Sequence, residues 1–299
     1  MTVSVTDLHY VALAVPDLAA EREFFGEKWG LIEVAEENGR VYFSAEGMPH
    51  PYVIVLREDS ERKTDLVGFS AASREDVLAI FEQVKAAGAK IISEPGPASG
   101  PAGGFAFRFF DPDGRAMEVI CDSTPRAFRK LDKGEAIPVG ISHVVFHSPD
   151  HKGLAAFFEN ALGFRLSDWI GNFMVFLRCN AAHHRVAILP GPPALNHIAF
   201  DVPAEKFDEY VERLKSKGIA VSQILNHDNS PSGSSAEVTD DVFVRSIYFF
   251  DPDGICLEFA SWVGRPFGPQ DVAHAPMTAE GVRDQSLIPA AKPSFEPAQ

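Results

Sequence analysis

Basic residues are scarce in this chain. Its 299 residues include 27 lysines and arginines against 42 aspartates and glutamates, which gives a formal net charge of -15 at pH 7. Nucleic acids and anionic membrane surfaces are bound by cationic faces, because such binding releases the counterions of the phosphates. No basic run offsets the acidic balance. We therefore expect neither nucleic acid nor a membrane among the partners.

Long apolar runs and closely spaced cysteines are also missing. No stretch approaches the roughly 20 apolar residues of a membrane-spanning helix, and the first fifteen residues have neither a basic leader nor a long apolar core. The three cysteines, Cys121, Cys179 and Cys256, are far apart and form no pair typical of zinc or redox sites. These absences predict a cytoplasmic protein with reduced cysteines.

One motif, Phe-Asp-Pro-Asp-Gly, occurs twice in the chain. It occupies residues 110–114 and 250–254, and a glutamate follows each copy, Glu118 in the first and Glu258 in the second. An Asp-Gly pair accommodates the positive φ that a tight turn between strands requires. The repeat indicates a duplicated structural unit.

Four segments share one order of elements, in which a strand leads into an amphipathic helix, a glycine and further strands. Asp17 and Asp150 are expected N-caps of two of the helices, and the other two helices are expected near 74–87 and 204–217. The pattern predicts an α+β fold of four β-α-β-β-β modules, at roughly 5–57, 65–122, 139–190 and 195–260.

The modules are expected to pair into two domains, each with its own core, since 45% of the residues are hydrophobic. Charge and proline interrupt the pattern between the pairs, and the end of the chain is rich in proline. The predicted organisation is an N-terminal domain at 1–122, a linker at 123–138, a second domain at 139–262 and an extension at 263–299.

Histidine is concentrated in the second half, since two of the ten histidines precede residue 139. His143 and His197 open the first strands of the third and fourth modules, and Glu258 lies in the last strand of the fourth. Pseudo-twofold pairing of the modules would bring these residues, here called the metal triad, to one cavity. Two imidazoles and a carboxylate on one side of a metal leave the other side open, as in non-haem Fe(II) enzymes. Considered one at a time, a histidine at the start of a strand is more often a packed or solvent-bonded residue, and a glutamate near the end of a strand is more often a surface residue.

The modular pattern and the Asp-Pro-Asp-Gly strands resemble the vicinal oxygen chelate superfamily, of glyoxalase, bleomycin-resistance and extradiol dioxygenase type, over about residues 5–262. The second half resembles type I extradiol catechol dioxygenases in two segments, 180–187 (Asn-Ala-Ala-His-His-Arg-Val-Ala) and 195–200 (Leu-Asn-His-Ile-Ala-Phe). Tyr248, ten residues before Glu258, falls where that family has a tyrosine that bonds the substrate.

The resemblance implies that the metal triad holds Fe(II), with Mn(II) as an alternative. It also implies that His184 is the acid-base histidine, that His183 has a structural role beside it, and that Tyr248 bonds a substrate oxygen. The implied reaction uses O2 to cleave a catechol-type ring next to its diol, in the catabolism of aromatic compounds. The expected partners are therefore a small aromatic diol and O2.

Aromatic residues near the histidine pair are candidates for the substrate pocket or for the strand core: Trp169, Phe173 and Phe176. The chain also departs from the family, which often has a further histidine about nineteen residues before the glutamate. Here residues 237–241 read Glu-Val-Thr-Asp-Asp. His227 could reach in from the loop at 226–242 instead.

In the first half, His9 and Glu118 are expected at the places of a triad histidine and the triad glutamate. The place of His197 falls near 67–69, which contain no ligand, so we expect a decayed metal site there. Two other functions stay open, a glyoxalase-type isomerase or transferase and a binding protein without chemistry. The exposed sheet edges of such modules favour a homo-oligomer.

Overall fold

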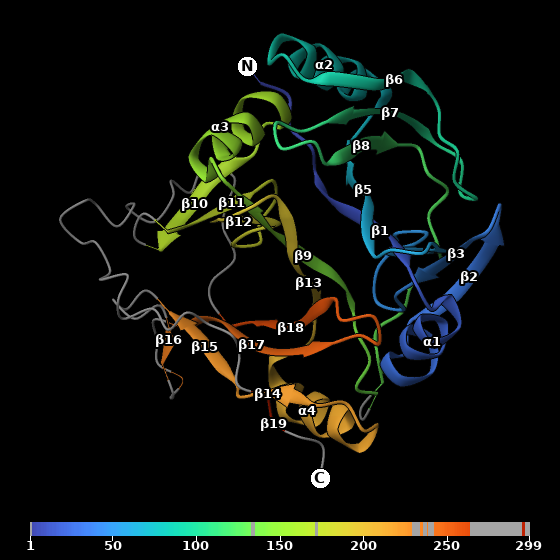
Figure 1. The fold of residues 1–299 in the computed structure, drawn as a ribbon, viewed down its shortest axis with the longest axis vertical. Coiled ribbons are helices and arrows are strands. Elements are labelled where there is room, and N and C mark those ends of the chain that lie inside the picture. Colours follow the sequence, from blue (N-terminus) through green and yellow to red (C-terminus); the bar gives the residue numbers. More distant parts are fainter. Residues whose placement is uncertain are drawn as a thin grey trace.

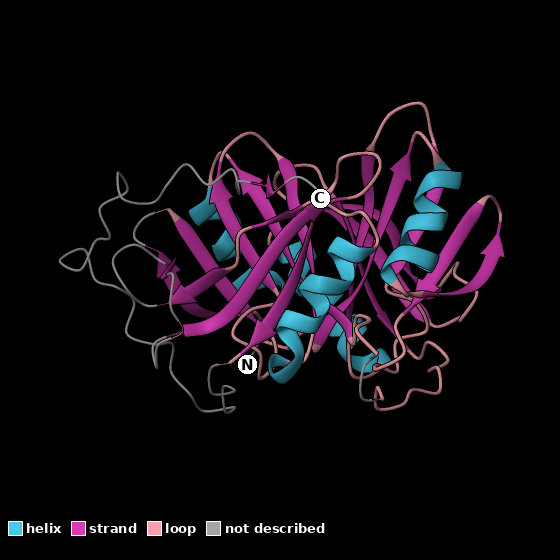
Figure 2. Ribbon diagram, turned by 90° about the horizontal axis from the view of Figure 1, so that it is seen from below, coloured by secondary structure: helices cyan, strands magenta, loops and turns pink. Residues whose placement is uncertain are grey.

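The computed structural model describes residues 2–132, 135–170, 173–228, 234–235, 238, 242–263 and 295–296. Two β-sheets lie side by side, and β1 of the first contacts β9 of the second (Figure 1). A view from below shows that strands dominate the fold and that the helices are few (Figure 2). Within the described ranges, no helix is long and apolar enough to cross a membrane.

The first sheet has eight strands in the order β2-β3-β4-β1-β5-β8-β7-β6. At its centre, β1 runs parallel to β4 and antiparallel to β5, and β5 runs parallel to β8. The elements of this half are β1 (Asp7–Val15), α1 (Leu18–Glu23), the π-helix η1 (Phe24–Trp29), β2 (Ile32–Glu37), β3 (Arg40–Ser44), β4 (Ile54–Glu58), β5 (Lys63–Ser70), α2 (Arg74–Ala86), β6 (Lys90–Pro97), β7 (Phe105–Phe110) and β8 (Ala116–Cys121).

The second sheet repeats this arrangement in the order β10-β11-β12-β9-β13-β18-β17-β15-β16. Its half contains β9 (Gly140–Ser148), α3 (His151–Leu162), β10 (Arg165–Ile170), β11 (Met174–Arg178), β12 (Val186–Pro190), β13 (Ala194–Asp201), the 3-10 helix η2 (Ala204–Lys206), α4 (Phe207–Ser216), β14 (Val221–Ser222), β15 (Leu225–Asp228), β16 (Ser234–Ser235), β17 (Val242–Phe250) and β18 (Cys256–Trp262). The predicted α+β fold of four modules is confirmed.

Of the predicted extension at 263–299, the structure describes residue 263 and β19 (Phe295–Glu296). β19 pairs antiparallel with β14, so the end of the chain adds a strand beside the fourth module. The rest of this segment lies outside the described residues. The domain boundaries drawn from the sequence stay a prediction.

The first helix of each half begins at the expected cap. The side chains of Asp17 and Asp150 each accept a hydrogen bond of 2.9 Å from the backbone N–H three residues later, which satisfies a free donor of the first turn. The first of these helices differs from expectation after residue 23, because residues 24–29 form the π-helix η1 and not an α-helix. It ends at Gly30, whose φ of 94° suits glycine.

The hydrophobic core is continuous across the two halves, so the expectation of two separate cores is wrong. Trp29 of η1 lies against the second sheet, with ring centroids 4.7 Å from Phe200 and 5.5 Å from Phe259. In the other direction, Phe158 of α3 meets Phe69 of β5 at 6.1 Å. Each half thus packs a helix against the sheet of the other, and truncating one such aromatic anchor to alanine costs about 3–5 kcal/mol.

Each sheet has a second face, here called the cavity face, that lies opposite the core. Side chains alternate along a strand, so in β9 Val144 and Phe146 belong to the core, whereas Val145 joins a small separate cluster with Phe176 and Ala187. The first sheet carries a comparable cluster that includes three tyrosines. The cavity faces are therefore where chemistry-bearing side chains gather.

The two Asp-Pro-Asp-Gly turns differ in the charged side chain that contacts them. In the first, Arg115 ion-pairs with Asp111 and Asp113 at 2.9 and 2.6 Å. The second copy has Ile255 in place of the arginine, and Glu21 of α1 accepts a hydrogen bond of 2.9 Å from the backbone N–H of Asp253.

Glu21 is fully buried beside Asp251, and each carboxyl group has one buried oxygen with no hydrogen-bond partner in the described part of the chain. Burial, and then the neighbouring Asp251 carboxylate, raise the pKa of Glu21 to about 8; burial likewise raises the pKa of Asp251. The two groups can be accommodated when they share a proton, so this contact between the halves depends on pH.

We expect Glu21→Gln to flatten the pH dependence of stability. Because the folded pKa of Glu21 lies above its unfolded value of 4.5, its neutral form stabilises the fold below about pH 4.5, and this contribution is lost as the pH rises towards 8. The loss is on the order of 2–4 kcal/mol. Urea unfolding at pH 5 and pH 8 measures it. Glu27→Gln, at an exposed position in η1, is the control, and equal pH slopes in wild type and Glu21→Gln would contradict the shared proton.

Candidate metal centre

Three neighbouring strands at the middle of the second sheet bring the metal triad together. β9 pairs antiparallel with β13, and β13 pairs parallel with β18. Ala199 of β13 lies opposite His143 on one side and opposite Glu258 on the other, and His197 is two residues before it on the same strand. The expectation that the first strands of the third and fourth modules are neighbours is confirmed.

The ligand atoms of the triad converge on one point. Oε2 of Glu258 lies 3.2 Å from Nε2 of His143 and 2.8 Å from Nε2 of His197, and the potential ligand atoms all lie within 4.8 Å of one another. The three residues are 1–6% exposed, so water does not solvate the carboxylate.

The electrostatics of the triad fit a cation. Burial alone would raise the pKa of Glu258, but the imidazoles of His143 and His197 outweigh it and hold that pKa well below its usual range. Burial lowers the pKa of His197, which favours the neutral imidazole. Within the described residues, His197 Nε2 and Glu258 Oε2 have no partner in hydrogen-bond geometry. A carboxylate oxygen and an imidazole lone pair that face each other repel, unless a cation lies between them.

A divalent metal ion would satisfy all three ligand atoms at once. Two imidazole nitrogens and one carboxylate oxygen suit Fe(II) and Mn(II), and all three ligands come from one sheet. The residues therefore fit the metal that the sequence motifs implied. Among the described residues, no second group of three histidines, cysteines or carboxylates with this spacing is found.

The triad lies in the wall of a small cavity of about 50 Å³. Its lining residues are His143, Val145, Met174, Phe176, His184, His197, His227, Phe243, Val244, Tyr248 and Glu258. Of the three aromatic candidates from the sequence, Phe176 lines the cavity, whereas Trp169 and Phe173 do not. The ring of Trp169 lies 6.2 Å from that of His151, at the start of α3.

Met174 and Phe243 also line this cavity and were not anticipated from the sequence. Met174 is two residues before Phe176 on β11, so strict alternation would have placed both on one face. Phe243 gives no such signal, because it lies beside Val244 in the same cluster at an irregular end of β17.

The two members of the histidine pair differ in their relation to the cavity. His184 lines the cavity, and its ring centroid lies 4.2 Å from that of His143. Its Nδ1 is 3.0 Å from Nδ1 of His183, which stacks on Phe243 at 4.3 Å outside the lining. Burial, and then the neighbouring imidazoles, hold the pKa of His184 well below its usual range, so the ring is neutral.

Tyr248 and His227 meet in the lining of the cavity. Tyr248 lies directly across from Glu258 in the β17–β18 pair, and its hydroxyl is 3.2 Å from Nε2 of His227. Burial raises the pKa of Tyr248, so the phenol keeps its proton. His227 lies on β15 and not in a loop, and it reaches the cavity from there. Of residues 237–241, all but Val238 lie outside the described residues.

A chain of hydrogen bonds behind the triad fixes the orientation of His197. Its Nδ1–H donates to Oδ1 of Asn196 at 2.5 Å, the amide of Asn196 donates to Nε2 of His147 at 2.8 Å, and Nδ1 of His147 lies 3.3 Å from the carbonyl oxygen of Pro190. Asn196 sits at a register shift of β13. With Nδ1 protonated, Nε2 of His197 is left for the metal. Sequence reasoning found no partner for His147.

We expect Asn196→Ala to weaken metal binding about 10–100-fold, because it removes the group that sets the tautomer of His197. Asn196→Asp keeps an acceptor at this position and should retain most of the affinity. Calorimetric titration with Mn(II) measures both. Asn180→Ala, which removes a hydrogen bond to Asp7 outside the cavity, is the control. Unchanged affinity in Asn196→Ala would exclude an orienting role.

The first sheet carries a different residue at the position of His143, and the expectation that His9 takes this place is wrong. The residue that pairs with the strand neighbour of Glu118 is Tyr10, and in the second sheet that position is His143. The Tyr10 hydroxyl donates to Oε1 of Glu118 at 2.8 Å. His9 lies at a register shift, and its Nδ1 is 2.9 Å from the Ser70 hydroxyl.

Comparison with known proteins gives relatives across nearly the whole chain. A family model described as the Glyoxalase/Bleomycin resistance protein/Dioxygenase superfamily matches residues 7–119 and 140–259. The chain is 25% identical over 284 residues to the biphenyl-2,3-diol 1,2-dioxygenase of Paraburkholderia xenovorans (strain LB400), covering 88% of this chain and 89% of that protein. It is 23% identical over 300 residues to the iron-dependent extradiol dioxygenase of Rhodococcus jostii (strain RHA1), covering 88% and 94%.

A solved structure is also similar over almost its full length. The Mn(II)-bound glyoxalase from Novosphingobium aromaticivorans has a TM-score of 0.83 and 37% sequence identity, covering 99% of this chain and 98% of that chain. The fold and the sequence of the two chains therefore correspond from end to end.

Proposed function

Because the chain belongs to the Glyoxalase/Bleomycin resistance protein/Dioxygenase superfamily, as its motifs predicted, we propose that it is an Fe(II)-dependent extradiol dioxygenase that opens the ring of a catechol-type diol with O2. The observation that carries the proposal is the buried triad of two imidazoles and one carboxylate, in a cavity that also contains His184 and Tyr248. The extradiol class predicted from the sequence is also the class of both dioxygenase relatives.

His143, His197 and Glu258 would hold the metal. When bound, Fe(II), or Mn(II) in its place, holds the diol and O2 next to each other and passes electron density between them. The three ligands belong to the second sheet, and Phe176 and Phe243 line the same cavity, where the reactants would lie.

The remaining lining residues have separate roles in the proposed reaction. His184 is neutral, and with its Nδ1–H donating to Nδ1 of His183, its Nε2 would accept a proton from a diol hydroxyl and later return it. The Tyr248 hydroxyl donates to a substrate oxygen, and His227 holds that hydroxyl in position. Phe176 and Phe243 pack on the ring and exclude water.

The cavity must widen before it holds an aromatic ring, because its volume of about 50 Å³ is far below the roughly 300–1,000 Å³ of ligand pockets. Met174 is the half-buried lining residue with the most rotatable bonds, and its side chain can turn away without disturbing the triad. We expect this movement on substrate binding.

A glyoxalase-type isomerase or transferase is the second candidate, and the 37% identity to the Novosphingobium glyoxalase favours testing it. Sites of that type typically have a second carboxylate or a glutamine in place of a histidine. Here His197 occupies the position, and Asn196 orients it. A cytoplasmic location and a homo-oligomer stay predictions.

The test is O2 consumption by anaerobically Fe(II)-loaded protein with a panel of monocyclic and biaryl catechols, with a glyoxalase assay in parallel. Uptake with a yellow ring-opened product is expected, and His197→Ala should lose it. His151→Ala, a histidine outside the cavity, is the control. Protein with stoichiometric iron that consumes no O2 with any diol would sink the proposal, and turnover in the parallel assay would then favour the isomerase or transferase.

A further inference from the structure

A second cavity lies on the cavity face of the first sheet and shares no lining residue with the metal triad. Its volume is about 580 Å³, against about 50 Å³ beside the triad, and it falls within the range of small-molecule sites. Three tyrosines, three arginines and Glu118 are among its lining residues.

Strand pairing shows that this cavity is the counterpart of the metal pocket with its ligands replaced. Leu66 stands where the second sheet has His197, since each lies two residues before the residue that pairs with the glutamate. Arg108 lies directly opposite Glu118, as Tyr248 lies opposite its glutamate. Arg108 Nε donates to Oε2 of Glu118 at 2.6 Å, while Tyr10 occupies Oε1. The Arg108 guanidinium balances the negative charge of Glu118, as a metal ion would balance that of Glu258 in the second sheet.

Two buried tyrosines present unused hydroxyl groups to this cavity. Tyr52 and Tyr42 are 3% and 6% exposed, and their rings meet edge to face at 5.1 Å. Tyr10 adds a third ring, 5.0 Å from Tyr52. Within the described ranges neither the Tyr42 nor the Tyr52 hydroxyl is one of the enclosed polar atoms, so both hydroxyls are open to the cavity.

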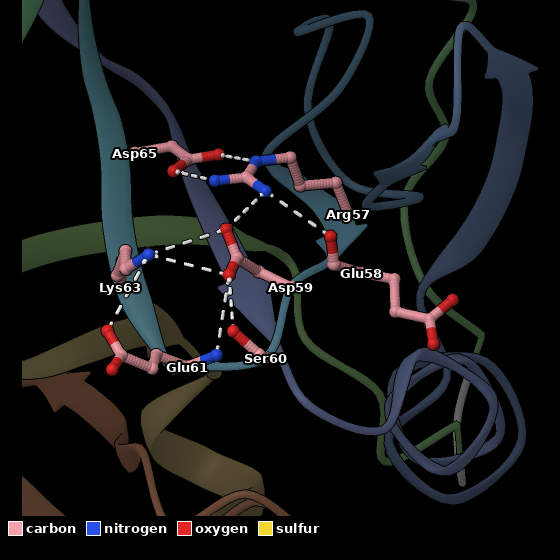
Figure 3. A network of polar contacts seen from close by, with 7 residues as sticks. All are labelled: Arg57, Glu58, Asp59, Ser60, Glu61, Lys63 and Asp65. Carbon is pink, nitrogen blue, oxygen red and sulfur yellow. Dashed lines mark hydrogen bonds and ion pairs between the residues drawn. The ribbon is translucent and has the colours of Figure 1, made fainter.

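The two carboxylates that line the cavity, Asp65 and Glu118, are already paired. Figure 3 shows Arg57 between Asp65 and Asp59, and both oxygens of Asp65 accept from this guanidinium. Both oxygens of Glu118 are engaged as well.

The donors are in excess. Arg40 forms no hydrogen bond or ion pair in the described part of the chain, and Arg108 keeps Nη1 free after bonding Glu118 and Ser99. The hydroxyls of Tyr42 and Tyr52 add to these. Such a site fits a ligand that brings negative oxygen atoms and a flat apolar body.

We infer that the first sheet binds a small aromatic carboxylate, with its ring among Tyr10, Tyr42 and Tyr52 and its carboxylate at Arg40 and Arg108. The site is separate from the metal triad and does not depend on the proposed function.

The experiment is calorimetric titration of the metal-loaded full chain with benzoate, and with benzamide and acetate as comparators. Benzoate is expected to bind at one site per chain, at least about tenfold more tightly than either comparator, because benzamide lacks the charge and acetate lacks the ring. Tyr52→Phe keeps the ring and removes only the hydroxyl that is open to the cavity. This variant and Arg40→Gln are each expected to weaken benzoate binding about tenfold.

Control variants locate the site. Tyr248→Phe changes the metal pocket, and Arg62→Gln changes an arginine outside the cavity; both should bind benzoate as wild type does. Benzoate binding that is lost in His197→Ala and unchanged in Tyr52→Phe would place the ligand at the triad and overturn the inference. Benzamide binding as tight as that of benzoate would show that the site does not recognise a carboxylate and would overturn the inference. No benzoate binding at about 10 mM would also overturn it.

Discussion

Glu258→Gln is expected to abolish metal binding while leaving the fold intact. It removes the anionic ligand between two imidazoles, at 3.2 and 2.8 Å, and the affinity for Fe(II) or Mn(II) should fall by more than the about 100-fold that an outer-shell partner controls. The glutamine amide has nearly the same size as the carboxyl group that it replaces, so the packing around it should be retained.

The thermal shift on adding metal measures this effect. The free energy of unfolding of the wild type should rise by about 4 kcal/mol when the free metal is a thousandfold above its dissociation constant. That of Glu258→Gln should not rise at the same metal concentration. Glu118→Gln is a matched control, because Glu118 occupies the same position in the first sheet but is bound by Tyr10 and Arg108. It should keep the full metal-dependent shift. If the shift vanished in Glu118→Gln and persisted in Glu258→Gln, the metal site would lie in the first half and not in the second.

His184→Gln is expected to lower kcat by about 10²–10⁴, the usual contribution of a positioned acid-base group. Its ring lies 4.2 Å from that of His143 but is not one of the triad, so metal affinity should stay within about threefold of wild type. Steady-state O2 consumption with saturating diol gives kcat, and titration with Mn(II) gives the affinity.

His151→Gln is the control for this experiment, because His151 lies outside the cavity. Unchanged kcat in His184→Gln would exclude proton transfer at this histidine. A parallel loss of metal would instead assign it a supporting role for His143. The two readouts therefore separate chemistry from structure.

Much of the site could be predicted because duplication fixes which strands are neighbours. His143 and His197 are far apart in the sequence, but each lies in the first strand of its module, and the two strands pair in the sheet. Once the modules are recognised, symmetry brings the two side chains to one face. Glu258 follows from the turn that precedes its strand.

The error at His9 came from matching one histidine to another. β1 has an extra residue between Leu8 and Tyr10, and β9 has one at the same place, between Ile141 and His143. The two strands therefore align without an offset, so His9 corresponds to Ser142 and Tyr10 corresponds to His143. Residue type was used where strand pairing decides the position.

The prediction of two cores failed for a related reason. The apolar faces of η1 and α3 show that these helices are buried but do not show which sheet covers them. Trp29 lies against the second sheet although it belongs to the first half. Trp169 and Phe173 were placed by distance along the chain, which does not determine the direction of a side chain.

The packing of η1 and α3 against the sheet of the other half limits which fragments of the protein can fold alone. A fragment that begins near residue 139 would carry all three triad residues, yet Phe200 and Phe259 would lose Trp29 as their cover. The exposed aromatic surface would favour aggregation over turnover. The half without metal ligands is therefore an integral scaffold of the catalyst, and a shorter working enzyme cannot be made by deleting it.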